Sequence, residues 1–96
     1  MTQQHTLKPE GIISIANAED FRTELRQTLE NGVSELTIDL ESVDMIDSTG
    51  LSVFVQCHQS LSERGGSLTV IAPADNIRNL FAVMGLDEHF TVRDAA

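Results

Sequence analysis

Strand-like and helix-like segments alternate along this 96-residue chain. The strand-like runs are short and rich in β-branched residues, whereas each helix-like run repeats its apolar residues every three or four positions. Such alternation favours an α/β domain in which right-handed crossovers connect the strands of a mostly parallel central sheet. We therefore predict one domain over residues 1–96 with the order β-β-α-β-α-β-α-β, and we expect the polar residues 1–5 to be disordered.

The expected strands are bounded by turn residues such as glycine and proline. A short acidic link is expected between the third strand and the second helix, because residues 41–47 carry three carboxylates and little alternation. The strands are expected at residues 6–8, 12–16, 36–40, 67–72 and 90–92.

Three helix-like runs lie between these strands. Helices are expected after a cap at Asn17, from Ser48 to Glu63, and after a cap at Asp75. In the first helix, Arg22 and Arg26 lie one turn apart and are expected on a solvated face. In the last helix, four apolar residues recur at helical spacing and are predicted to face the core. They are Ile77, Leu80, Phe81 and Met84. The alternative is that Phe81 and Met84 are partly exposed beside the second helix and contact a partner.

Composition excludes several classes of function. Fifteen acidic residues against six basic ones give a net charge of −9, so the surface would repel nucleic acid. No run approaches the ~18 apolar residues of a membrane span, so direct membrane insertion is not expected. The single cysteine, Cys57, cannot form an internal disulfide, and the first residues lack the pattern of a signal peptide. A cytoplasmic location and no bound cofactor are therefore predicted.

The junction Ile46-Asp47-Ser48-Thr49-Gly50-Leu51 is the segment with the clearest functional potential. Backbone N–H groups at a helix start lack partners, and the helix dipole is positive there. Asp47 is expected to cap the helix. Ser48 can serve the same capping role, or its hydroxyl can accept a phosphate that adds about −1.5 to −2 charges. Gly50 is either a packing residue or a gap through which a partner backbone approaches Ser48.

The residues give no support for an enzyme. Ser48 lies in no Gly-x-Ser-x-Gly turn, and no histidine has an evident reason to face it. His58 is expected to be a half-buried packing residue. The carboxylates at Asp39, Asp44 and Asp47 match no metal-binding loop, so no metal site and no catalytic residue are predicted.

The chain resembles STAS domains of the bacterial anti-sigma factor antagonist type. The resemblance rests on residues 36–40 followed by 46–51, on Gly65-Gly66, on the strand at 67–72 and on residues 80–86. It implies a regulatory binding module that is not an enzyme. In that family the unphosphorylated protein binds an anti-sigma factor, which is also a serine kinase with an ATPase-type fold. Phosphorylation ends the binding, and a PP2C-type phosphatase restores it.

The resemblance also implies roles for single residues. The phosphorylated serine of the family corresponds to Ser48. Family members often carry Gly-Glu-Leu-Asp in the second strand, where this chain has Gly11-Ile12-Ile13-Ser14. This departure is compatible with an alternative function, namely an unphosphorylated STAS scaffold subunit of a transporter-associated, chemotaxis or biofilm signalling complex. The residues expected to bind the partner are Asp47, Ser48, Thr49, Gly50, Ser14, Asp39 and Ser52.

Overall fold

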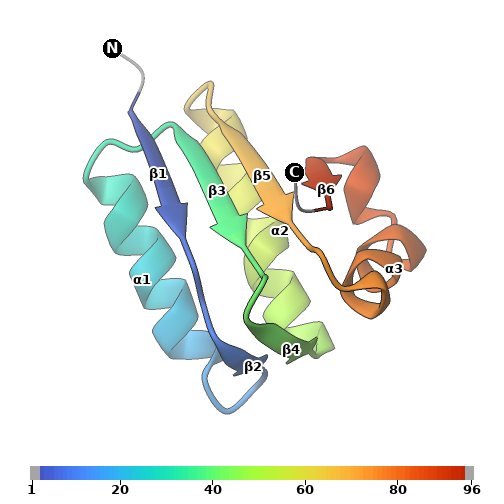
Figure 1. The fold of residues 1–96 in the computed structure, drawn as a ribbon. Coiled ribbons are helices and arrows are strands. Elements are labelled where there is room, and N and C mark those ends of the chain that lie inside the picture. The colour runs from blue at the N-terminus through green and yellow to red at the C-terminus, as the bar shows by residue number, and fades with distance from the viewer. Residues whose placement is uncertain (1–2, 95–96) are drawn as a thin grey trace.

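The computed structural model describes residues 3–94, which form an α/β structure of six strands, three α-helices and one short 3₁₀ helix (Figure 1). The strands are β1 (Gln4–Leu7), β2 (Gly11–Ile13), β3 (Glu35–Asp39), β4 (Val43–Ile46), β5 (Ser67–Ile71) and β6 (Thr91–Arg93). The helices are α1 (Ala18–Glu30), α2 (Ser48–Glu63) and α3 (Asp75–Val83), with the 3₁₀ helix at Leu86–Glu88.

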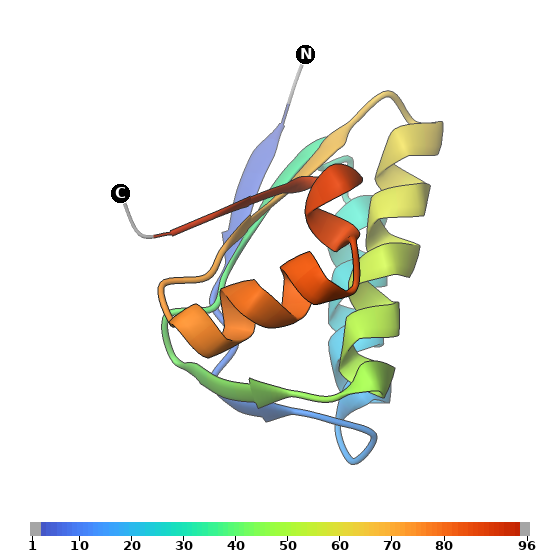
Figure 2. The same ribbon diagram turned by 90° about the vertical axis from the view of Figure 1, so that its right-hand side faces the viewer.

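The strands pair in parallel throughout the described residues. The main sheet has the order β1-β3-β5-β6, and β2 pairs with β4 in a separate two-stranded sheet. Figure 2 shows α1 and α2 along one side of the main sheet, while α3 contacts β4 and β6. The predicted α/β class with a mostly parallel sheet is therefore confirmed.

The core lies between the sheet and the helices. In α1 the buried residues Phe21, Leu25 and Leu29 recur every fourth position, and in β3 Leu36 and Ile38 point toward the helices. At the centre, the ring of Phe54 lies 5.4 Å from the ring of Phe21 and 5.4 Å from the ring of Phe81, measured between ring centroids. These aromatic contacts connect α1, α2 and α3.

The expected link between β3 and α2 contains a strand that sequence periodicity did not predict. Val43 and Ile46 of β4 are buried, whereas Asp44 and Met45 between them are exposed. Buried residues three positions apart do not follow the two-residue repeat of a strand, and Asp is a poor strand former. The pairing with β2 also has an irregular register between Gly11 and Ile12. The strand therefore exists because β2 pairs with it.

The first strands differ from the expectation at their ends. Gln4 and His5 belong to β1, which forms the edge of the main sheet beside β3, so the expectation of disorder was wrong for these two residues. Met1 and Thr2 lie outside the described residues. The second strand ends at Ile13 and not at residue 16, because the chain turns through Ser14–Asn17 into α1.

One predicted helix cap and one predicted core residue were wrong, and a second cap is correct in position alone. Asn17 occupies the N-cap position of α1 as predicted, but its side chain hydrogen-bonds to Ser14 and Ile12 and makes no capping bond to α1. Asp75 is the first residue of α3, where it pairs with Arg78, and Ala74 occupies the cap position. Met84 is 55% exposed, because α3 ends at Val83 and the chain then turns at the left-handed Gly85.

Candidate functional site

Ser48 is the first residue of α2 and is exposed to solvent. It follows β4, and β4 runs parallel to β2, so the chain segments that leave both strands meet at the same edge. The segment that leaves β2 is Ser14–Asn17. The candidate site therefore consists of the start of α2 together with this neighbouring loop.

Asp47 connects the two parts of the site. One carboxylate oxygen accepts a hydrogen bond from the Gly50 N–H (2.8 Å), as the predicted cap of α2. The other accepts one from the Ile15 N–H (3.0 Å), and the Asp47 N–H itself donates to the Ile13 carbonyl (3.1 Å). The hydrogen bond from Gly50 makes the largest contribution to lowering the pKa of Asp47. Asp47 therefore remains ionised while it holds the loop against α2.

Gly50 is buried, and its Cα faces the chain's own β2. A Cβ at this position would lie 2.8 Å from the Ile13 carbonyl oxygen and 2.9 Å from the Cγ2 atom of Ile46. The close approach of α2 to the β2–β4 pair thus requires a residue without a side chain. Of the two interpretations given above, the packing interpretation accounts for Gly50. By allowing the first turn of α2 to pack closely against β2 and β4, Gly50 also fixes the position of Ser48.

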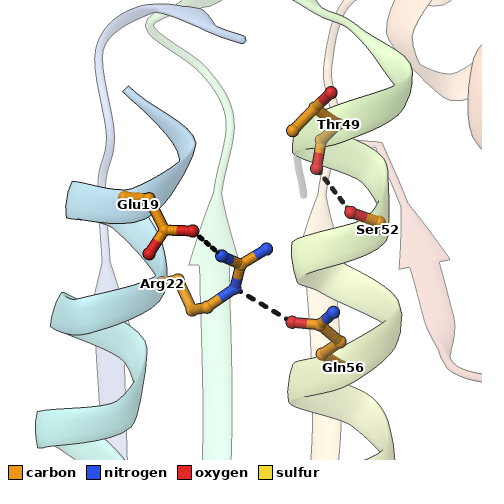
Figure 3. Close-up of polar contacts among 5 residues, drawn as sticks. All are labelled: Glu19, Arg22, Thr49, Ser52 and Gln56. Atoms are coloured by element: carbon orange, nitrogen blue, oxygen red, sulfur yellow. Dashed lines mark hydrogen bonds and ion pairs between the residues drawn. The ribbon is translucent and has the colours of Figure 1, made fainter. Parts of the chain in front are cut away.

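The hydroxyl groups around Ser48 take part in local backbone bonds. Ser14 Oγ accepts a hydrogen bond from the Ala16 N–H (3.2 Å) within the loop. Ser52 Oγ donates to the Thr49 carbonyl (2.7 Å) one turn along α2, as Figure 3 shows. Ser14 therefore belongs to the loop that Asp47 holds, and Thr49 and Ser52 belong to the first turns of α2 after Ser48.

Asp39 does not join this site. Its strand neighbours Ile38 and Leu40 are buried under the helices, so the side chain of Asp39 points to the opposite face of the sheet from α2. There its carboxylate lies 3.8 Å from Lys8 Nζ and accepts a hydrogen bond from the Glu41 N–H. The expectation that Asp39 shares a surface with Ser48 is thus not met, because strand alternation separates the two residues.

Comparison with known proteins identifies the family of this chain. The family model described as "STAS domain" matches residues 2–95. The chain belongs to the STAS domain family. Among its relatives is the anti-sigma-B factor antagonist of Staphylococcus aureus, with 29% identity over 83 residues, which cover 86% of this chain and 74% of the relative.

Solved structures agree with this assignment. A Thermotoga maritima protein matches this STAS domain with a TM-score of 0.90 and 26% identity, over 96% of this chain and 80% of that one. The anti-sigma factor antagonist SpoIIAA matches in its unphosphorylated form with a TM-score of 0.78 (16% identity, 100% and 84% coverage). The phosphorylated form from Bacillus matches with a TM-score of 0.77 (18% identity, 100% and 86% coverage). At such identities the SpoIIAA matches show the shared fold.

Exposed apolar side chains surround the start of α2 in this STAS domain. Ile12 and Met45 are partners in the β2–β4 register and are 50% and 57% exposed, and Ile15 is 76% exposed. The sequence reading missed this surface, because it placed Ile12 and Ile15 in one buried strand and Met45 in a link. The available signal was the pair of isoleucines at 12 and 15, which flank Ser14 and the buried Ile13, because the strand ends at Ile13 and leaves both side chains exposed.

A metal site and a membrane-spanning helix each have requirements that the described residues do not meet. Within residues 3–94, no three His, Cys, Asp or Glu side chains are grouped so that they could hold a metal ion. In the same part of the chain, no helix is both long and apolar enough to cross a lipid bilayer.

His58 is half-buried as predicted, and the centroid of its ring lies 5.5 Å from the centroid of the Phe90 ring.

The double role of Asp47 leads to a pH-dependent prediction for Asp47→Asn. The pKa of Asp47 is lower in the folded protein than its ordinary value of 3.8, so the carboxylate stabilises the fold at pH above that value. This contribution is lost as the pH falls through the lowered pKa. We expect Asp47→Asn, which keeps only one of the two acceptors, to be less stable than wild type at neutral pH. The difference should shrink below pH 3.8 in thermal unfolding curves.

The matched control for this prediction is Asp44→Asn, which removes an exposed carboxylate from the neighbouring strand β4. Asp44→Asn should follow the wild-type pH dependence. If Asp47→Asn is as stable as wild type at neutral pH, the two hydrogen bonds of Asp47 do not hold the loop to α2.

Proposed function

We propose that this STAS domain is a protein-binding switch of the anti-sigma factor antagonist type, controlled by reversible phosphorylation of Ser48. The observation that carries the proposal is the exposed Ser48 at the first position of α2, beside the loop that Asp47 holds against the helix. The similarity to the Staphylococcus aureus antagonist supports the same role. The function is binding, and no residue of the site is assigned to catalysis.

The partner is an anti-sigma factor that also acts as a serine kinase with an ATPase-type fold. Its binding surface consists of Asp47–Thr49, Ser52 and the loop at Ser14, flanked by the exposed side chains of Ile12 and Met45. Exposed apolar side chains gathered beside polar groups are typical of protein interfaces. A PP2C-type phosphatase returns Ser48 to its free form.

A phosphate on Ser48 would act on the surface and not on the fold. The adjacent Asp47 carboxylate already accepts the hydrogen bonds of Gly50 and Ile15, so the phosphate would add charge beside an existing negative group. A partner interface that fits the neutral Ser48 hydroxyl would have to remove water from this dianion without pairing its charge. The cost of this desolvation would weaken partner binding. The similar TM-scores to the unphosphorylated and phosphorylated forms of SpoIIAA support a switch that leaves the fold in place.

Mass spectrometry of the tagged protein purified from its source cells tests this proposal. We expect a phosphate that maps to Ser48, and we expect the Ser48→Ala variant to retain a kinase-type partner after ATP is added, while wild type releases it. The alternative of an unphosphorylated scaffold subunit predicts the opposite pattern. In that case Ser48 would be unmodified under all growth conditions, and both proteins would keep the same partners with and without ATP.

A further inference from the structure

A groove of about 390 Å³ runs between α1 and α2, away from the start of α2 where Ser48 lies. Its floor is apolar and includes the buried side chains of Leu25, Leu29 and Val53. Its rim carries three guanidinium groups, from Arg22, Arg26 and Arg64. A groove with this lining presents both an apolar surface and positive charge.

The charge in the groove is opposite to that of the molecule. The chain has a net charge of −9 and only six basic residues, yet three of these line this one groove, where Glu30 is the acidic neighbour. Concentrating cations against the overall charge raises the local concentration of anions. The groove is therefore suited to a negatively charged ligand.

The side chains at the two ends of the groove are held in position. Arg22 pairs with Glu19 on α1 and donates to the Gln56 side chain on α2 (3.0 Å), as Figure 3 shows. At the other end, Arg64 donates to the Leu29 carbonyl (2.7 Å). Between them, Arg26 is exposed and has no ion pair with any carboxylate within residues 3–94. Its guanidinium group is available to a ligand.

We propose that this groove binds a small amphiphilic anion, with the apolar body on the floor and the anionic head group on Arg26. The volume falls within the range of about 300–1,000 Å³ that small-molecule sites occupy. From Arg22 to Leu29 the groove extends roughly 11 Å at 1.5 Å per helical residue, which suits a medium-length carboxylate. Such a ligand would bind independently of Ser48, so this proposal and the switch can fail separately.

Cys57 lines the floor of the groove, where its thiol is uncharged and unreactive. Burial raises the pKa of its thiol to about 11, so the sulfur carries no charge at neutral pH. The thiol therefore offers the ligand an apolar contact and no nucleophile. A ligand held in this groove would be bound and released without covalent change.

Titration of the protein with octanoate, followed by amide NMR shifts, tests the proposal, with 1-octanol as the uncharged probe of equal length. We expect saturable shifts in residues 22–30 and 53–64, with octanol binding at least about tenfold more weakly because it lacks the charge-assisted bond. Arg26→Gln should weaken octanoate binding by a similar factor. Arg93→Gln, which removes an exposed arginine from β6, should leave it unchanged.

Three results would overturn the proposal. They are octanol binding as tightly as octanoate, unchanged octanoate affinity in Arg26→Gln, and shifts that do not saturate or that lie outside the two helices. Arg26 is exposed, so its replacement should not affect folding, and an unchanged unfolding midpoint would confirm this for the variant. The binding result therefore reports on the groove itself.

Discussion

Replacing Phe54 with alanine is expected to destabilise the protein by about 3–5 kcal/mol. Phe54 is fully buried, and its ring lies between Phe21 of α1 and Phe81 of α3. Removing it leaves a cavity where three helices meet and also removes two aromatic contacts, each worth about 0.5–1.5 kcal/mol beyond the buried area. Urea unfolding at equilibrium measures this loss directly.

The control for Phe54→Ala is Gln59→Ala on the exposed side of the same helix. Surface substitutions of this kind change the free energy of unfolding by less than about 0.5 kcal/mol. Since small domains are stable by only about 5–15 kcal/mol, the Phe54 variant should unfold at a much lower urea concentration. Similar midpoints for the two variants would show that the helices do not depend on this aromatic contact.

Replacing Ser48 with aspartate is expected to weaken binding of the proposed anti-sigma partner by between about 30-fold and a few thousand-fold. This range corresponds to the ~2–5 kcal/mol that a mismatched buried charge typically costs in an interface. The new carboxylate would stand beside that of Asp47 at the centre of the proposed surface. Isothermal titration calorimetry with the purified partner measures the affinity change.

Ser62→Asp is the matched control for this prediction, because it adds the same charge to an exposed position at the other end of α2. It should leave the affinity unchanged. A negative charge at the start of α2 is favourable to the helix dipole, so Ser48→Asp should not lower the stability of the fold. If Ser48→Asp binds the partner as tightly as wild type, a negative charge at residue 48 does not control binding.

The parts of the fold that the sequence predicted well are those with strong local signals. The bounds of α2 match the prediction at both ends, because Asp47 caps its start and Arg64-Gly65-Gly66 ends its apolar repeat. The strand β4 was missed because its burial does not alternate. Asn17 is at the predicted cap position of α1, but its side chain bonds to Ser14 and Ile12 and not to the helix. At β4 and at Asn17, contacts with other segments of the chain determine the structure more than the local secondary-structure preferences of the residues.

In the candidate site, too, features with a local sequence signal could be predicted, whereas contacts between distant segments could not. Asp47 could be predicted as a cap from its position before a helix, but its second hydrogen bond, to Ile15, joins segments that are far apart in sequence. Arg22 was expected on a solvated face, yet it bonds to Gln56 across the α1–α2 groove. Helical spacing shows which residues share a face, but it does not show which other helix lies opposite that face.

The parallel pairing of the strands has a consequence for how the chain folds. No two paired strands of the main sheet are joined by a hairpin, since β1 and β3 are separated by α1, and β3 and β5 by α2. Each pairing must close a long loop before any inter-strand hydrogen bond forms. The strand pairs should therefore form more slowly than the local contacts within each helix. The sheet therefore assembles only as its crossover helices dock, and the first contacts to form should be helical.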